Sequence, residues 1–423
     1  MINKILAALK KAGVSVYNIV DTVTESAEIY FIKKQEDMRR MKSIREITVT
    51  VYRDFEANDK KMRGMSDVQI APGMTEEEIA KKISVAYESA CYVMNPFFEL
   101  ADPVKDVVEA KSEIRDLPLE EAARIMADAL FTPDTDEEAF INSAEIFVDL
   151  QRVHILSSLG SDISFTKERV WGEFVAQCVR PQDVEMYFDF NYDTLDTYAL
   201  SKLSLDAITI VSDRAQAKSA PAAGEYDLIL TEKHVNTVLS SYLEKADAAM
   251  IFAKYSPYEI GFNAQGESIQ GEKLNLMCEP DQPYSMDGVK LIERTILKDG
   301  VVSDLVGATR FCRYMGIEPK GHFSKIRVEN GTVSLDEMKK KPYLMPVAFS
   351  DFQMDAMSGR FGGEIRLAYL FDGESISLVT GGSVNGSLLE KQNQLVFSKE
   401  TYRSSDYSGP LAVLIPSVSV AGA

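Results

Sequence analysis

The chain has 423 residues, with 46 Lys and Arg against 65 Asp and Glu, so its formal net charge is -19. This acidic balance argues against a protein that binds nucleic acid directly, because phosphate binding needs a concentrated basic face. The length exceeds what a single hydrophobic core usually supports, and a hydrophobic content of 45% is enough for two or three domains.

The cysteines and the N-terminus indicate the compartment. The 4 cysteines form no CxxC pair, which is typical of reduced thiols in a cytoplasmic protein and predicts no disulfide framework and no zinc knuckle. The N-terminal stretch "MINKILAALKKAG" lacks the long apolar core of a signal peptide. No apolar run approaches the roughly 20 residues that a membrane span requires. We therefore expect a cytoplasmic protein without a membrane partner.

The first part of the chain predicts an α+β domain over residues 1–100. A short helix is expected to end at Gly13, and a second helix is expected from Thr75 to Val93, where Glu78 can complete a capping box. Between them, β-branched and aromatic residues alternate with charged ones, as in antiparallel strands, in "EIYFIKK", "REITVTVYRDF" and "SDVQIAPG". The N-terminal domain is therefore predicted to be an antiparallel sheet with flanking helices.

Residues 101–219 are predicted to form a middle α+β segment that packs with the first domain. The charged stretch 103–115 is typical of a linker, and helices are expected over residues 118–130 and 196–217. Three further strands are predicted between these helices, in "AEIFVDLQRVHILSS", "ISFTKERVWGEFVAQCV" and "VEMYFDFNYDTL".

A C-terminal domain is expected over residues 220–423. The small, proline-containing stretch "AKSAPAAGEY" before and around its start is typical of a boundary. The domain is predicted to be mainly β, antiparallel and barrel- or sandwich-like, with one helix near its start. Asx-Gly pairs tolerate the positive φ of tight hairpin turns. Four such pairs predict turns: Asp287-Gly288, Asp299-Gly300, Asn330-Gly331 and Asp372-Gly373.

The helix expected over residues 230–248 is a candidate place for a metal site, because it carries His234 and Glu244. His234 lies on the margin of its apolar stripe, where a solvated first-turn histidine is favoured over a metal ligand. A zinc helix needs two histidines one turn apart, and the residue one turn after His234 is Val238. His154 lies in a strand and His322 in a glycine-rich loop, so no histidine-based metal site is predicted. The stripe consists of Val235, Val238, Leu239, Tyr242 and Leu243.

Other chemical motifs are weak. The sequence contains no GxSxG, P-loop or GxGxxG pattern. Two glycine-rich stretches, "SGRFGG" (358–363) and "GGSVNG" (381–386), are interpreted as bends or bulges, with close backbone approach to a bound chain as the alternative. Glu185, Asp189 and Asp193 share one face of a predicted strand, where a solvated acidic face is favoured over a calcium site.

The C-terminal third carries a resemblance to a known family. It contains, in order, "SMDGVKLIERTILKDGVVSDLVGATRFCRYMG", "KIRVENGTVSLDEM", "DAMSGRFGGEIRLAYLFDGESISLVTGGSVNGSLLEKQNQLVF" and "GPLAVLIPSVSVAG". This ordered set resembles the C-terminal domain of the TldD/TldE family, whose TldE members are also called PmbA and modulators of DNA gyrase. The helix, strands and helix at the start resemble the family's N-terminal domain, so the resemblance covers most of the chain.

The resemblance implies a subunit of a cytosolic two-subunit zinc metallopeptidase that cleaves unfolded peptides. TldD-type subunits hold zinc with HExxxH on the helix after the first strand of this domain, together with a late cysteine. Here neither histidine is present, and no cysteine follows Cys312. The chain therefore resembles the TldE/PmbA type, which binds no cofactor, and zinc is expected in a TldD-like partner. Matching that strand to "DLIL" puts the motif at Ser240, Ser241, Tyr242, Leu243, Glu244 and Lys245.

The leading hypothesis is a noncatalytic subunit that binds unfolded peptide and completes the chamber of the complex, in peptide maturation and proteolysis. Peptide would add to a strand edge of the C-terminal domain. The residues expected to line it are Ser358, Gly359, Arg360 and Phe361, where Arg360 replaces an acidic residue of the family pattern. The alternative is a standalone homodimeric peptide-binding or scaffold protein that has lost its peptidase partner. A third hypothesis is an enzyme whose site is not visible in the sequence.

Overall fold

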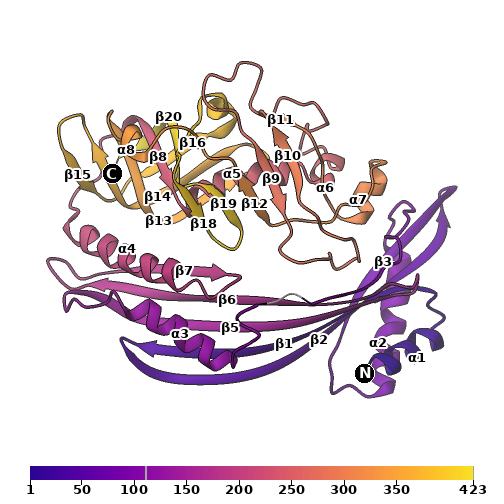
Figure 1. Ribbon diagram of the computed structural model, residues 1–423. Coiled ribbons are helices and arrows are strands. Elements are labelled where there is room, and N and C mark those ends of the chain that lie inside the picture. Colours follow the sequence, from indigo (N-terminus) through magenta and orange to yellow (C-terminus); the bar gives the residue numbers. More distant parts are fainter. Residues whose placement is uncertain (110–111, 423) are drawn as a thin grey trace.

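The computed structural model describes residues 1–109 and 112–422 (Figure 1). A long curved sheet with helices forms the N-terminal half. The C-terminal half lies above this sheet in Figure 1, with helix α4 between the two. The predicted α+β class is confirmed, because helices and antiparallel strands both occur in the N-terminal half and strands dominate the C-terminal half.

The N-terminal half contains a 7-stranded sheet in the order β3-β2-β1-β5-β6-β4, with β7 paired to β6. β1 pairs with β2 on one side and with β5 on the other, so residues from before and after position 100 share one sheet. The division into segments 1–100 and 101–219 stays a prediction. The strands are β1 (Val16–Ile32), β2 (Gln35–Ala57), β3 (Lys60–Ile70), β4 (Lys105–Val108), β5 (Ala139–Ser157), β6 (Asp162–Cys178) and β7 (Val184–Tyr192).

The linker expected over residues 103–115 is wrong for part of that stretch. β4 pairs in parallel with β6, from Lys105 opposite Asp162 to Val108 opposite Phe165. Residues 110 and 111 lie outside the described residues. A linker was predicted because these residues are charged. β4 is a short strand at the margin of the sheet, where charged side chains are common.

Two pairs of helices cover the sheet. At one end α1 and α2 pack on Ile47, Val49 and Val51 of β2. The capping box predicted at the start of α2 is confirmed, since Thr75 Oγ1 accepts from the Glu78 amide at 3.2 Å and the Glu78 carboxylate accepts from the Thr75 amide at 2.8 Å. The core under α3 and α4 continues into the C-terminal half. These helices are α1 (Ile2–Lys11), α2 (Glu76–Ser89), α3 (Leu119–Phe131) and α4 (Thr197–Gln216).

Five strands of the C-terminal half close into a barrel, which confirms the barrel-like prediction. Their order is β13-β8-β20-β16-β14, and β14 pairs again with β13. Only the contact between β13 and β8 is parallel among these pairs. β15 (Ile376–Val379) and β17 (Val396–Phe397) attach to β14 and β20. The barrel strands are β8 (Gly224–Thr231), β13 (Tyr343–Asp355), β14 (Arg360–Phe371), β16 (Ser383–Ser387) and β20 (Ala412–Ala421).

A second, 6-stranded sheet has the order β11-β10-β9-β12-β19-β18. It shares one apolar core with the barrel and with helix α5 (Lys233–Lys245), whose predicted apolar stripe is buried. The strands are β9 (Leu276–Glu279), β10 (Arg294–Lys298), β11 (Val301–Val302), β12 (Lys325–Val328), β18 (Thr401–Arg403) and β19 (Tyr407–Pro410). Short helices follow α5: α6 (Ala248–Phe252), α7 (Thr309–Tyr314), α8 (Leu335–Met338) and α9 (Leu388–Lys391).

The Asx-Gly turns are largely as predicted. Asp299 and Gly300 have φ of 52° and 78° and join β10 to β11 as a hairpin. Gly288 and Gly373 also have positive φ, 86° and 108°. The hairpin predicted at Asn330-Gly331 is wrong, because β12 before it pairs with β9 and β19 and not with a following strand.

Across residues 1–109 and 112–422, no helix combines the length and the apolar character needed to cross a membrane. The cytoplasmic location stays a prediction.

Candidate functional site

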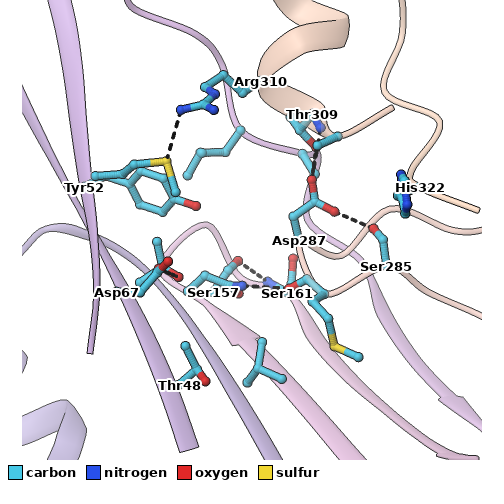
Figure 2. Close-up of a pocket in the computed structure, with 18 of the residues that line it drawn as sticks. Thr48, Tyr52, Asp67, Ser157, Ser161, Ser285, Asp287, Thr309, Arg310 and His322 are labelled. Atoms are coloured by element: carbon cyan, nitrogen blue, oxygen red, sulfur yellow. Dashed lines mark hydrogen bonds between the residues drawn. The ribbon is translucent and has the colours of Figure 1, made fainter. Parts of the chain in front are cut away.

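A cleft of about 670 Å³ lies between the N-terminal sheet and loops of the C-terminal half (Figure 2). Its lining mixes large apolar side chains with a few polar groups, as is typical of ligand sites. The large side chains are Tyr17, Tyr52, Phe98, Leu159, Met286 and Phe311.

The floor of the cleft follows from strand alternation. Thr48, Thr50 and Tyr52 point to one face of β2, and the intervening residues Ile47, Val49 and Val51 point to the other, where they pack on α1 and α2. The register extends the floor sideways. Asn18 of β1 and Asp67 of β3 both lie opposite Thr50. The same alternation therefore builds an apolar core on one face and a cleft on the other.

Asp287 organises the opposite wall. Its carboxylate accepts from the Thr309 amide at 3.1 Å and from Thr309 Oγ1 at 2.5 Å, and the hydroxyl of Ser285 donates to its other oxygen. The turn that carries it uses Gly288 at φ 86°. Asp287 thus holds the start of α7 against the loop before β10, and its oxygens are already occupied by donors.

Arg310 crosses the cleft from α7 toward the sheet, as Figure 2 shows. Its guanidinium lies over the Phe311 ring, 4.4 Å from the centroid, and Nη1 donates to Asn95 Oδ1 at 3.4 Å. Nη1 is also 3.8 Å from the sulfur of Met65 on β3. The side chain provides a positive charge on the wall that also carries Asp287.

Tyr52 lies between Asp67 on the floor of the cleft and Asp287 on the opposite wall. Burial raises the pKa of its phenol, and the carboxylates of Asp287 and Asp67 raise it further. The phenol therefore stays protonated at neutral pH, as a hydrogen-bonding group and not as a base.

His322 lines the cleft where the loop before β12 meets α6. Its Nδ1 lies 3.2 Å from Oδ2 of Asp247, and Oδ1 of the same aspartate accepts from the Ala249 amide at 2.7 Å as the N-cap of α6. The hydrogen bond to Asp247 raises the pKa of His322. The imidazolium is thus stabilised in the folded protein.

We expect Asp247→Asn to lower the pKa of His322, because the substitution removes the carboxylate that stabilises the imidazolium. In the unsubstituted protein, this pair contributes stability below the unfolded pKa of about 6.5, and the contribution is lost as pH rises through the folded pKa. Proton NMR titration of the His322 ring measures the shift. Asp351→Asn removes an equal charge from β13 and should leave the titration unchanged. An unchanged titration in Asp247→Asn would contradict the contact.

The solvated position expected for His234 is wrong. The side chain is 7% exposed, and its ring lies edge-on to Phe349 and Phe352, with centroid distances of 4.9 and 5.3 Å. Both phenylalanines belong to β13, which covers the first turn of α5. Burial lowers the pKa of His234 to about 4, so the ring is neutral at physiological pH.

The residues expected to line a bound peptide form the turn between β13 and β14. Ser358 and Arg360 are exposed, and Ser358 Oγ donates to Asp355 Oδ2 at 2.5 Å. Gly359 is buried with φ 70°. The Phe361 side chain is 4% exposed and points into the barrel core. This turn is not part of the cleft lining, and its role in peptide binding stays a prediction.

Comparison with known proteins identifies the C-terminal half. Residues 223–422 match the PmbA/TldA metallopeptidase C-terminal domain. Residues 223–422 are thus a domain of the TldD/TldE (PmbA) family. No curated protein matches its sequence.

Solved structures of low identity share the TldD/TldE-family fold over nearly the whole chain. A proposed modulator of a DNA gyrase from Thermotoga maritima MSB8 is 15% identical, with a TM-score of 0.76, and the match covers 99% of each chain. TldE from Thermococcus kodakarensis is 14% identical, with a TM-score of 0.74, over 99% of this chain and 100% of that one. A proposed modulator of DNA gyrase from Bacteroides thetaiotaomicron VPI-5482 is 15% identical, with a TM-score of 0.78, over 100% and 98%.

The positions that resemble the family's zinc motif do not fit zinc in this chain. Ser241 is buried and its hydroxyl donates to the Val238 carbonyl at 2.7 Å, and the Ser240 hydroxyl donates to Thr237 at 3.4 Å. Lys245, at the position of the second histidine, is 6% exposed. A protonated ammonium has no lone pair to give a metal, and serine hydroxyls are poor zinc ligands.

Lys245 lies between two regions that the TldD/TldE resemblance identified, the zinc-motif positions on α5 and the turn between β13 and β14. Burial lowers its pKa, and the Asp355 carboxylate partly offsets this effect. The interaction places the C-terminal end of α5 close to the β13–β14 turn that carries Ser358 and Arg360. Glu244, the neighbouring motif position, is exposed.

The acidic strand face on β7 is held by polar partners. Asp189 pairs with Lys233 of α5 at 2.8 Å, and Asp193 lies 3.4 Å from Lys325 of β12. Glu185 instead accepts from Asn142 at 2.8 Å. In the part of the chain that the structure describes, no three or more His, Cys, Asp or Glu side chains form a group that could hold a metal.

Sequence reasoning missed the cleft itself. Its lining comes from separate segments between Tyr17 and Ser324, which only the fold brings together. One local signal was present: β2 alternates Thr48, Thr50 and Tyr52 with apolar residues, which indicates one face in a core and one more polar face.

Proposed function

We propose that this chain is the noncatalytic subunit of a TldD/TldE-type zinc metallopeptidase complex. It binds unfolded peptide and completes the chamber, while a TldD-like partner supplies the zinc. The observation that carries this proposal is the chemistry of α5. Where the resemblance places zinc ligands and a general base, this chain has two serines that hydrogen-bond to their own helix and the buried Lys245.

The cleft supports the peptide-binding part of the proposal. A volume of about 670 Å³ accommodates a few residues of an extended peptide. Tyr17, Tyr52 and Phe311 offer apolar area to side chains of many shapes, and Thr48 and Thr50 offer hydroxyls to a peptide backbone. Such a surface binds without demanding a particular sequence, as handling of unfolded peptides requires.

Co-expression with a TldD-like subunit that carries HExxxH tests the assignment. We expect the two chains to purify together, and unfolded casein to be cleaved by the pair and not by this chain alone. Chelation of zinc should abolish the cleavage. If this chain alone hydrolysed casein and a chelator stopped the reaction, the noncatalytic assignment would be wrong.

A cleft variant tests where the peptide binds. Thr50→Arg narrows the cleft and should raise the KM of the pair for peptide on the order of tenfold, which corresponds to about 1.4 kcal/mol. Thr209→Arg adds the same side chain on the exposed face of α4 and should leave KM unchanged. Equal KM values in the two variants would mean that the peptide binds outside the cleft.

The alternative function is a standalone homodimeric peptide-binding or scaffold protein without a peptidase partner. A specific observation favours self-association, because among the described residues β2 has a strand partner on one side only over positions 36–46. A stable homodimer together with no co-purifying TldD-like subunit would favour this alternative.

A further inference from the structure

Arg310 carries a charge in the cleft that no carboxylate of the described residues pairs with. Its guanidinium has two polar contacts there, and both are long: Asn95 Oδ1 at 3.4 Å and the sulfur of Met65 at 3.8 Å. Both contacts are made by Nη1, so the Nε and Nη2 donors have no partner among the described residues. The side chain is half-buried and faces the cavity.

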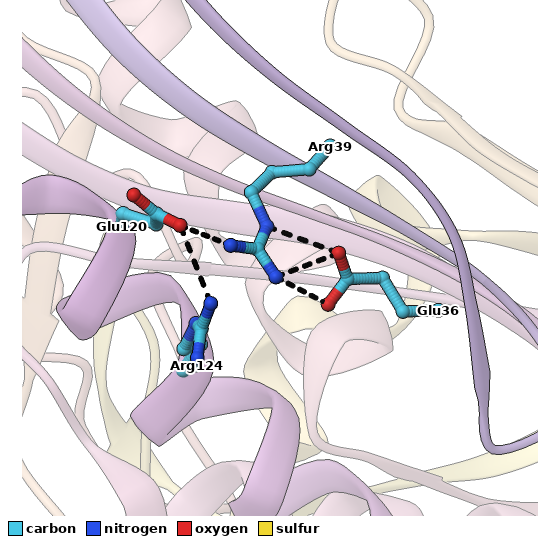
Figure 3. A network of polar contacts seen from close by, with 4 residues as sticks. All are labelled: Glu36, Arg39, Glu120 and Arg124. Atoms are coloured by element: carbon cyan, nitrogen blue, oxygen red, sulfur yellow. Dashed lines mark hydrogen bonds and ion pairs between the residues drawn. The ribbon is translucent and has the colours of Figure 1, made fainter.

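Other arginines of this chain are bound by carboxylates. Figure 3 shows Arg39 between Glu36, at 2.7 Å, and Glu120 of α3. Arg63 of β3 forms two hydrogen bonds with Asp54, at 2.7 and 2.8 Å. A charge that has lost part of its hydration is stabilised by such a partner, and is costly without one. The guanidinium in the cleft therefore has both the charge and the donors to bind an added carboxylate.

The phenol of Tyr52 lies at the same end of the cleft. Met65, which contacts Arg310, stands opposite Tyr52 in the pairing of β2 with β3. Tyr52 is 8% exposed, and its hydroxyl forms no hydrogen bond with a described residue. Because burial raises its pKa, the phenol keeps its proton at neutral pH and can donate it to a hydrogen bond. A guanidinium and a hydroxyl that face one space suit the two oxygens of a carboxylate.

The acidic residues of the cleft leave this charge available. Asp287 already accepts from three donors, and Asp281 pairs with Lys167 at 2.7 Å. Asp67 is exposed and lies two residues from Met65 along β3, a separation of about 7 Å. At that separation, and with solvent access, Asp67 repels a bound carboxylate less than a guanidinium in contact attracts it.

We propose that Arg310 and Tyr52 bind a carboxylate of the peptide, so that the cleft prefers unfolded peptides with a free C-terminus or an acidic side chain. This inference rests on the proposed function, since it names the chemical group that the peptide cleft selects. Met65 and Phe311 lie against the guanidinium and exclude water from it, which strengthens the contact.

Fluorescence anisotropy with the full chain and labelled octapeptides tests this preference. The peptides share one uncharged sequence of alanine, serine and leucine and an uncharged fluorophore at the N-terminus. One pair compares a free C-terminal carboxylate with a C-terminal amide. A second pair, both amidated, compares a central glutamate with a central glutamine. We expect the carboxylate member of at least one pair to bind about tenfold more tightly than its neutral counterpart. The pair that shows the preference identifies the source of the carboxylate.

Three substitutions test which residues hold the carboxylate. Arg310→Gln should abolish the preference, and Arg310→Lys should retain part of it, because lysine keeps the charge and loses the paired donors. Tyr52→Phe should reduce the preference about threefold. The neutral peptides should bind all three variants as they bind the unsubstituted chain, which shows that each variant is folded.

The matched control is Arg366→Gln, which removes the same charge from an exposed position on β14 outside the cleft lining. It should keep the full preference. The inference is wrong if carboxylate and neutral peptides bind the unsubstituted chain equally, and in that case the proposed function stands. It is also wrong if Arg310→Gln keeps the preference. Absence of binding by every peptide would contradict the proposed function itself, and this inference with it.

Discussion

Replacement of Phe361 by Ala is expected to lower the free energy of unfolding of the C-terminal barrel by about 3–5 kcal/mol. The side chain is 4% exposed, and its ring centroid lies 6.3 Å from that of Phe352. It also packs directly on Gly386, where an added Cβ would come within 2.2 Å of the ring. Loss of the ring leaves a cavity that these neighbours cannot fill. Chemical denaturation followed by circular dichroism measures the change.

The matched control is Met357→Ala, which removes an exposed side chain of the same turn and should change stability by no more than about 0.5 kcal/mol. The experiment also tests the peptide-lining role predicted from the sequence for Phe361. If Phe361→Ala weakened peptide binding and left stability unchanged, the ring would be a binding group and not a core residue.

Acid is expected to destabilise the chain through His234 by about 3 kcal/mol between pH 6.5 and 4. The folded pKa is lowered to about 4 by burial, whereas the unfolded pKa is about 6.5. In this window the unfolded state binds a proton that the folded state does not, so stability falls as pH decreases. Denaturant unfolding at several pH values measures this slope.

His234→Phe provides the comparison, because a phenyl ring fits beside Phe349 and Phe352 and does not titrate. Between pH 6.5 and 4 its stability should fall by about 3 kcal/mol less than that of the unsubstituted chain. Equal slopes in His234→Phe and the unsubstituted chain would mean that the ring is solvated after all.

His234 was predicted to be solvated and is buried, which shows what a single sequence can and cannot predict. The capping box at Thr75 and the apolar stripe of α5 were predictable, because each depends on residues within a few turns. The burial of His234 depends on Phe349 and Phe352, which lie more than a hundred positions later in the chain. The histidine stands at the margin of its stripe, so only the packing partner decides its exposure.

The same reasoning applies to the cleft. The alternation of Thr48, Thr50 and Tyr52 was readable, but its meaning depends on the loops that carry Asp287 and Arg310. The short strand β4 was missed because its residues are charged and its pairing with β6 is long-range. Local pattern thus predicted which elements exist, and tertiary packing decided what they face.

The zinc-motif positions on α5 show both what the sequence predicts and what it does not predict. The resemblance to the TldD/TldE family located Ser240, Ser241 and Lys245 as the motif positions at which the zinc ligands are missing. It did not predict that Lys245 would be buried near Asp355, because the β13–β14 turn is distant in sequence.

The proposed function requires that this chain binds unfolded peptide in its cleft and does not cut it. The most direct measurement follows binding and cleavage in one sample of the isolated chain, using fluorescence anisotropy of a labelled unfolded peptide and mass spectrometry of the same peptide afterwards. We expect saturable binding that Thr50→Arg weakens and Thr209→Arg does not, with the peptide recovered intact. Recovery of cleaved peptide, in a reaction that a zinc chelator stops, would contradict the account.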